Sequence, residues 1–340
     1  MDRDIIASYE NLYEAYKAAK KGSNCSQDSA KFQVMALEGI QNLRKLLIDQ
    51  TYQMDEYKRF MIYEPKERLI ETCSFKDKVV QHSLSDNILH PRLADVFIRT
   101  NYAGQIGKGT DFARDCLKEQ MLEFYDKHGL DGWILKCDIE KFYYSIDHEV
   151  LKDIVDYYFE DDFTRWLNHL IIDSTKNPGS PLGNQAVQVY ALMLLNPVDH
   201  MVTGDLGVDL YGRYTDDFYL ICFEKLYLEY CLKSIENMID SLKLKLNGKT
   251  QIVPFKNGIS FLGFHHYVTE DGTYIRKLSG NKKREVKKRF RRMAELVRNG
   301  KMTEEKFYEK YEGWKNHAMK GNCIKLCHSM DVFVEKELRK

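Results

Sequence analysis

Gly212-Arg-Tyr-Thr-Asp-Asp-Phe-Tyr-Leu-Ile221 places two adjacent acids, Asp216 and Asp217, between two apolar runs that favour β-structure. This pattern predicts a β-hairpin with both carboxylates at its turn. Two unpaired acids inside a strand would be costly to desolvate unless a cation compensates them. A divalent metal is the usual compensating cation at a paired-aspartate turn. The hairpin therefore predicts a metal-dependent site.

A third acid in a similar setting is Asp138, near the end of an apolar strand expected over Trp133–Ile139. If this strand lies beside the hairpin in one sheet, Asp138 and Asp216 converge. Two Mg²⁺ ions about 3.5–4 Å apart, which Mn²⁺ can replace, would there activate a 3′-hydroxyl and stabilise the leaving pyrophosphate. Magnesium also keeps water and substrate phosphates as ligands, so few protein ligands suffice: Asp138, Asp216, Asp217 and the main chain of Ile139.

The composition fits one compact, multi-lobed protein of 340 residues with 44% apolar residues and a net charge of zero. The charge is unevenly spread, because residues 276–301 carry twelve Lys or Arg against two acids. Such a basic block favours contact with a nucleic-acid backbone, and a solvated helical face is the alternative. The eight cysteines are scattered, and the chain shows neither a signal core nor a long apolar run. We therefore expect a cytoplasmic protein without a membrane partner.

The order of predicted elements is that of an α+β protein, an antiparallel sheet with helices on one face. Strands are expected within 60–73, at 250–254 and at 259–268. Helices are expected at 30–50, 111–128 and 224–243, and the chain after 279 is expected to be helical. A further helix from Asp77 should stop at Pro91, and a long helix should run from Asn184 to Val202.

Several segments resemble the successive motifs of reverse transcriptases, in the correct order, over about residues 35–330. Motif A is resembled by Asp138-Ile-Glu-Lys-Phe-Tyr143, and motif B by Gly179–Gln188. Motif C is resembled by Tyr214-Thr-Asp-Asp217, and motif E by Phe261-Leu-Gly-Phe264. The upstream bacterial motifs are resembled by Pro65–Ile70, Phe75–His82 and residues 102–113. The resemblance implies a right-hand polymerase that copies template RNA into cDNA. Its parts would be N-terminal helices and fingers at 1–134, a palm at 135–268 with a fingers or helical segment at about 150–182, and a basic helical thumb at 269–340.

The resemblance is strongest to the reverse transcriptases of diversity-generating retroelements. Most reverse transcriptases carry Gln where this chain has Leu182, and here Gln188 closes the motif. Val187 departs from the usual Ser of that group. The group's enzymes make frequent errors at template adenines and act with a small helical accessory variability protein. Because Leu182 offers no hydrogen bond to a nucleotide, we expect loose base selection, with packing beneath the loop as the alternative.

The resemblance also implies roles for single residues. Tyr143 would exclude a ribose 2′-hydroxyl, unless it is a buried core residue. Lys249 would protonate the leaving pyrophosphate, unless it is an ordinary surface lysine. The residues that would hold the incoming dNTP are Lys66, Arg68, Ile139, Tyr143, Leu182, Gly183 and Gln188. Among them, the arginine can donate two parallel hydrogen bonds to phosphate oxygens. Primer and template would be held by Lys108, Phe261, Leu262, Gly263, Arg284 and Lys288.

Three alternatives stay open. An RNA-dependent RNA polymerase would share the palm but would need an acid where Tyr143 stands. A reverse transcriptase of a phage-defence, retron-like or intron system would share the motifs. A palm-fold protein that binds RNA without catalysis would have no need of Asp138, Asp216 and Asp217.

Overall fold

The computed structural model describes residues 1–21, 27–63, 67–181, 183–278 and 280–340. Two of the predicted nucleotide contacts, Lys66 and Leu182, lie outside the described residues. The chain divides into two compact units, each described by itself below. The first comprises Met1–Gly109, Cys137–Phe218 and Tyr230–Thr250, and the second comprises Thr110–Lys136, Tyr219–Glu229 and Gln251–Lys340. The division into fingers, palm and thumb stays a prediction.

The first unit begins with a group of helices: α1 (Asp2–Ile6), α2 (Tyr9–Lys21), α3 (Gln27–Val34), α4 (Ala36–Ile48) and α5 (Phe75–Leu84). The single helix predicted over 30–50 is wrong, because the chain leaves helical geometry at Met35 (φ −118°, ψ 38°). The bend lets α3 fold back on α4, and the ring of Phe32 lies against Gly39. A side chain at that glycine would stand 3.0 Å from the ring, so only glycine fits there without a shift.

Helix α5 begins earlier and its helical path continues further than predicted. Ser74 caps it by accepting a hydrogen bond from the Asp77 amide at 3.4 Å. The chain then continues through a π-helical turn (Ser85–Leu89) into α6 (His90–Leu93), so the predicted stop at Pro91 is wrong. Proline has no N–H to donate, and the altered bonding of a π-turn leaves room for such a residue at the start of the next helical turn.

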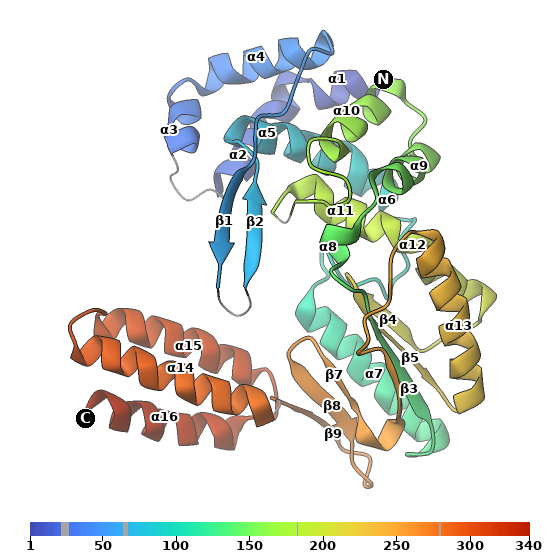
Figure 1. Ribbon diagram of the computed structural model, residues 1–340, viewed down its shortest axis with the longest axis vertical. Coiled ribbons are helices and arrows are strands. Elements are labelled where there is room, and N and C mark those ends of the chain that lie inside the picture. The colour runs from blue at the N-terminus through green and yellow to red at the C-terminus, as the bar shows by residue number, and fades with distance from the viewer. Residues whose placement is uncertain (22–26, 64–66, 182, 279) are drawn as a thin grey trace. The chain divides into compact units, whose positions relative to one another are not determined.

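Strands β1 (Lys58–Ile62) and β2 (Arg68–Thr72) form an antiparallel hairpin, as predicted for 60–73. Figure 1 shows it as a separate two-stranded arm. All five residues of β1 are exposed, and an ion pair joins Arg59 to Glu71 across the strands. The hairpin therefore has no buried face of its own, and such two-stranded pieces are marginally stable alone.

The central sheet has the strand order β4–β5–β3–β6. These strands span Trp133–Asp138 (β3), Tyr211–Tyr214 (β4), Asp217–Cys222 (β5) and Gln251–Pro254 (β6). The chain between these strands contains the helices α8 (Phe142–Ser145), α9 (His148–Tyr158), α10 (Asp162–Ile172), α11 (Gln185–Leu194), α12 (Asn196–His200) and α13 (Lys225–Ser241). The single helix predicted from Asn184 to Val202 is interrupted at Leu195, because Pro197 at the start of α12 cannot donate to the preceding turn.

The second unit contains α7 (Thr110–His128), a 3₁₀ turn at Phe255–Asn257 and the sheet β7–β8–β9 (Ile259–Phe261, Phe264–Val268, Tyr274–Lys277). Its end is α14 (Gly280–Arg298), α15 (Glu304–Met319) and α16 (Ile324–Leu338), which Figure 1 shows side by side. Their shared core includes Phe290, Phe307, Tyr311 and Trp314. Among the described residues no helix is both long and apolar enough to cross a bilayer.

Candidate functional site

The paired acids lie at a tight turn between β4 and β5, as predicted. Asp216 occupies the turn, and Asp217 is the first residue of β5. Both side chains are half-buried. Thr215 takes a left-handed backbone conformation (φ +54°), which is costly for a β-branched residue. Its hydroxyl lies 3.0 Å from the Asp216 carboxylate and can donate to it.

Asp138 is the last residue of β3, and β3 is the neighbour of β5 in the central sheet. The carbonyl of Asp138 accepts a hydrogen bond from the Asn247 amide at 2.7 Å, and Ile139 forms a bridge with Leu246. The predicted proton donor, Lys249, is exposed two residues beyond Asn247. The loop that carries Lys249 is thus bonded to the end of the strand that carries Asp138.

Tyr143 links three segments that are far apart in the sequence. Its pKa is raised to about 12, mainly by burial and also by the negative charges of Asp216 and Tyr214, while the positive charge of Arg68 acts in the opposite direction. Each of these charged groups therefore lies close enough to Tyr143 to act on its hydroxyl. The structure therefore brings together Tyr143 after β3, Asp216 at the hairpin turn and the exposed Arg68 at the start of β2.

The loop before α11 is bonded to α8. The Ser180 amide donates to the Tyr143 carbonyl at 2.7 Å, and the Gly179 amide donates to the Ile146 carbonyl at 2.9 Å. His148 supports the loop, because its Nε2 lies 2.9 Å from the Gly179 carbonyl. Tyr143 and the predicted nucleotide-binding loop thus share one bonded framework.

Two further predicted nucleotide contacts flank this framework. Gly183 has φ +116°, a conformation that favours glycine, and a Cβ built there would lie 3.5 Å from the Glu71 carbonyl of β2. On α11 the side chain of Gln188 is exposed, whereas Val187 and Val189 beside it are buried. Both predicted positions are thus accessible to a ligand in the first unit.

In the second unit, Leu262 and Gly263 form the turn between β7 and β8, with φ of +43° and +94°. Arg114 of α7 donates from Nε to the Leu262 carbonyl at 3.3 Å. Both turn residues are half-buried, but the ring of Phe261 is 1% exposed. Any contact of Phe261 with a primer would therefore pass through its main chain.

Arg284 and Lys288 are exposed and one turn apart on α14, as a phosphate-binding face requires. Lys108, in the first unit, donates to the carbonyls of Ile98 at 3.2 Å and Asn101 at 2.9 Å. Its ammonium therefore fastens its own loop, and its predicted contact with template phosphates stays a prediction.

The donors at the hairpin suit a hard divalent cation, because carboxylate and carbonyl oxygens are the ligands that Mg²⁺ prefers. The negative charge of Asp216 acts on Tyr143, and a bound cation would offset this charge. In the described part of the chain, no three His, Cys, Asp or Glu side chains are grouped closely enough to hold a metal by themselves. A site here would accordingly need the phosphates of a substrate and water as further ligands.

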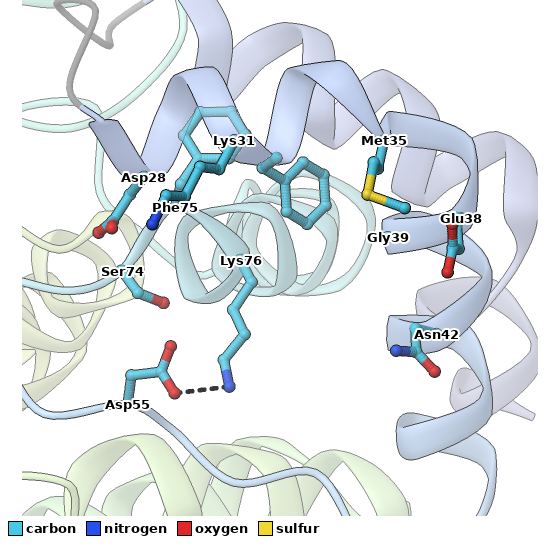
Figure 2. A pocket seen from close by; sticks show the side chains of 11 residues that line it. Asp28, Lys31, Met35, Glu38, Gly39, Asn42, Asp55, Ser74, Phe75 and Lys76 are labelled. Atoms are coloured by element: carbon cyan, nitrogen blue, oxygen red, sulfur yellow. Dashed lines mark ion pairs between the residues drawn. The ribbon is translucent and has the colours of Figure 1, made fainter.

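A cavity of about 400 Å³ in the first unit contains none of the predicted site residues. Figure 2 shows it beside the start of α5, with an ion pair of 2.6 Å between Lys76 and Asp55. Its acids and lysines are mixed, so it has no single charge preference. The lining residues are Asp28, Lys31, Phe32, Met35, Glu38, Gly39, Asn42, Asp55, Ser74, Phe75 and Lys76.

Two contacts near the site were not predicted from the sequence. Arg213, directly before Tyr214, forms a fully buried ion pair with Asp199 of α12. The hydroxyl of Tyr144 donates to the Leu69 carbonyl of β2 at 3.1 Å. The only signal for the first was an arginine inside an apolar strand, and the second left no trace in the sequence pattern.

Comparison with known proteins matches the part of the chain that contains Asp138, Tyr143 and the Asp216–Asp217 hairpin. The family described as "Reverse transcriptase (RNA-dependent DNA polymerase)" matches residues 63–266. No curated protein matches the chain significantly. Similar solved structures include telomerase from Candida albicans with a TWJ fragment of telomeric RNA, at 15% identity and a TM-score of 0.50 over 73% of this chain and 50% of that one.

Two further structures are telomerases from Candida tropicalis. Apo telomerase matches at 14% identity and a TM-score of 0.50, over 62% of this chain and 46% of that one. The form truncated from the C-terminal domain matches at 12% identity and 0.51, over 68% and 58%. The chain thus spans about half the length of these telomerases. At such identities the likeness shows the fold, and the predicted α+β right-hand architecture is confirmed.

Proposed function

The chain belongs to the family of reverse transcriptases, which are RNA-directed DNA polymerases, and from this membership we propose that it extends a DNA primer on template RNA by two-metal nucleotidyl transfer. The observation that carries the proposal is that Asp216 and Arg68 both lie close enough to Tyr143 for their charges to act on it. One side chain would stand beside the sugar, one beside the metal and one beside the triphosphate. Three separate motifs therefore contribute to one place in the first unit.

In this proposal Asp138, Asp216 and Asp217, with the carbonyl of Ile139, hold two Mg²⁺ ions, which Mn²⁺ can replace. The ions supply an activated 3′-hydroxyl nucleophile and charge stabilisation of the pyrophosphate. The ring of Tyr143 leaves room for a 2′-hydrogen and none for a 2′-hydroxyl.

The other residues of the chain would bind and orient the substrate. Arg68 and Lys66 grip the phosphates, and Lys249 holds the proton that the leaving pyrophosphate takes. Gly183 and Gln188 border the nucleotide. Leu262 and Gly263, beside Phe261, would seat the primer end, and Arg284 and Lys288 would hold the backbone of the template–primer duplex.

Within the family, we propose a role in a diversity-generating retroelement, with a small helical accessory protein as partner. The support is the motif with Leu182 and Gln188. A template RNA is the expected nucleic-acid partner, and the Candida albicans telomerase was likewise solved with RNA. The rival hypothesis, a reverse transcriptase of a phage-defence or retron-like system, shares the chemistry. A template repeat, a variable repeat and an accessory gene beside the coding gene would distinguish them.

Primer extension tests the catalytic proposal. The protein, an RNA template with an annealed DNA primer, dNTPs and Mg²⁺ should give full-length cDNA, and ribonucleotides in place of dNTPs should not. Asp216→Asn and Asp217→Asn should each abolish the product, while a matched surface change on α13, Glu236→Gln, should leave it intact. Product from the Asp216→Asn, Asp217→Asn double variant would refute catalysis at this turn. An inactive wild type that still binds RNA would favour the non-catalytic alternative.

Replacement of Leu182 by Gln tests the proposed subtype. The variant should make fewer errors at template adenines, because Gln restores a polar contact on which discrimination can rest. Sequencing of the cDNA from both proteins measures the change, and Gln188→Leu serves as a second variant. An unchanged error rate at adenines would remove the support that Leu182 gives to the retroelement hypothesis.

A further inference from the structure

The residue directly before Tyr214, in strand β4, is an arginine with no exposed surface. Arg213 and its partner Asp199 are both 0% exposed, which places a full ion pair inside the protein. Removing two charges from water is expensive, and such pairs can often be replaced by apolar residues without loss of stability. Stability alone therefore gives no reason for this pair.

The pair is held in a two-point geometry. Arg213 donates from Nε to Oδ1 of Asp199 at 2.6 Å and from Nη2 to Oδ2 at 2.5 Å. Asp199 also accepts from the Tyr211 hydroxyl at 2.6 Å and, more weakly, from Asn101 at 3.4 Å. A guanidinium held by both oxygens of one carboxylate has a fixed plane, so its other N–H groups point in fixed directions. One of them, on Nη2, donates to the Leu192 carbonyl at 3.4 Å.

Another of these N–H groups reaches the turn before Asp216. Nη1 of Arg213 donates to the carbonyl of Thr215 at 3.0 Å. Thr215 is the left-handed residue directly before Asp216, a conformation that needs support from its surroundings. The main chain of Arg213 is fixed as well, since its amide donates to Thr100 at 2.9 Å and its carbonyl accepts from Tyr102 at 2.8 Å.

We propose that Arg213, with Asp199 as its buried counter-ion, is a positioning residue that fixes the Thr215 carbonyl and thereby the direction of the Asp216 carboxylate. The inference rests on the proposed function, because it concerns how the metal-binding acid is aimed. The buried charge of Arg213 then has a reason. Thr215 is a β-branched residue in left-handed geometry, and the ion pair with Asp199 holds the donor that supports its carbonyl.

The test compares variants that separate the turn contact from the rest of the network. Arg213→Lys keeps the charge but cannot span Asp199 and Thr215 together. The control Tyr211→Phe removes one hydrogen bond to the same Asp199 and leaves the turn contact intact. Turnover, the KM for dNTP, the Mg²⁺ concentration for half-maximal activity and Mn²⁺ affinity by electron paramagnetic resonance are measured, with thermal unfolding to check the fold.

Arg213→Lys should lower kcat about tenfold to a hundredfold, because misplacement of a reacting group carries such costs. It should weaken Mn²⁺ binding in parallel and leave the KM for dNTP nearly unchanged, while Tyr211→Phe should match the wild type. A folded Arg213→Lys protein with wild-type turnover and Mn²⁺ affinity would overturn the inference. If the wild type makes no cDNA but the Mn²⁺ difference remains, the proposed function fails and the positioning role stands.

A second variant covers the case in which Arg213→Lys does not fold. The double change Arg213→Met, Asp199→Leu fills the space with apolar groups and removes both charges together. A folded double variant with the same loss of Mn²⁺ affinity and turnover would support the inference. A folded double variant with wild-type values, or failure of both proteins to fold, would overturn it, because the pair would then serve the core and not the turn.

Discussion

The hydroxyl of Tyr144 donates a hydrogen bond to the main-chain carbonyl of Leu69 at 3.1 Å, and so joins α8 to the β1–β2 hairpin. The hairpin strands have largely exposed side chains, so the arm has little packing of its own to fix its position. Arg68 is the neighbour of Leu69, and its positive charge acts on Tyr143. This hydrogen bond therefore helps to fix the position of Arg68, for which we propose a contact with the nucleotide.

Removal of the Tyr144 hydroxyl should weaken nucleotide binding. One hydrogen bond contributes about 0.5–1.5 kcal/mol, so Tyr144→Phe should raise the KM for dNTP about twofold to tenfold with little change in kcat. Steady-state primer extension measures both constants. Tyr157→Phe, at a tyrosine that is 81% exposed, is the matched control. An unchanged KM for Tyr144→Phe would mean that the arm is held by other interactions.

Tyr143 should select the sugar by its ring and not by its hydroxyl. Tyr143→Ala should improve ribonucleotide incorporation relative to dNTP about tenfold to a hundredfold, because it removes a steric wall. Tyr143→Phe keeps the ring and should keep the discrimination. Because the pKa of Tyr143 is about 12, its hydroxyl stays neutral near pH 8, and Tyr143→Phe should also keep the wild-type pH profile. Equal discrimination in all three proteins would contradict the steric role.

His266 should make the second unit sensitive to mild acid. Its pKa is lowered from 6.5 to about 4, mainly by burial and also by the charges of Arg276 and Arg114, while the hydrogen bond to the Phe261 carbonyl acts in the opposite direction. The unfolded chain then binds a proton at higher pH than the folded chain. The contribution of His266 to the free energy of unfolding is fully present above pH 6.5. It is lost as the pH drops toward 4, and the loss is about 3 kcal/mol at most.

Denaturant titrations of the wild type and of His266→Gln between pH 7 and pH 4 measure this effect. The variant should lose less stability over the interval, since Gln cannot be charged. His265→Gln changes the adjacent histidine and should retain the wild-type slope. Identical slopes for wild type and His266→Gln would show that acid acts on other groups.

The exposed face of α14 should hold nucleic acid by charge. Arg284→Ala with Lys288→Ala should weaken binding of an RNA–DNA duplex and reduce the slope of log affinity against log salt by roughly 2, one for each phosphate that is no longer neutralised. The control Lys325→Ala, Lys336→Ala removes the same charge from α16. Fluorescence anisotropy at several salt concentrations measures the slopes, and equal slopes for the two pairs would argue against a specific role for α14.

The hairpin that carries Asp216 and Asp217 could be predicted from the sequence because its signals are local. Two acids between apolar runs give both the strands and the turn, and the structure places β4 and β5 there. Asp147, directly before α9, is of a residue type that favours the cap position of a helix, and its carboxylate accepts a hydrogen bond from the Val150 amide at 3.1 Å. The helix Thr110–His128 begins within one residue of its prediction.

The remainder could not be predicted because it depends on partners distant in the sequence. Pro91 is a stop signal by itself, but the π-turn before it allows the helical path to continue. The short strand β9, Tyr274–Lys277, lacks an apolar alternation and exists through its pairing with β8. The pair between Arg213 and Asp199 joins a strand to a helix, and neither residue indicates the other in the sequence.

The bond from the Ser180 amide to the Tyr143 carbonyl couples two kinds of fidelity. Tyr143, which we propose excludes a ribose 2′-hydroxyl, and the loop that we propose borders the base are joined by this one hydrogen bond. A substitution that tilts either of them will displace the other. If both proposed roles hold, selection of the sugar and selection of the base are coupled, and a substitution that loosens base selection should also change the use of ribonucleotides.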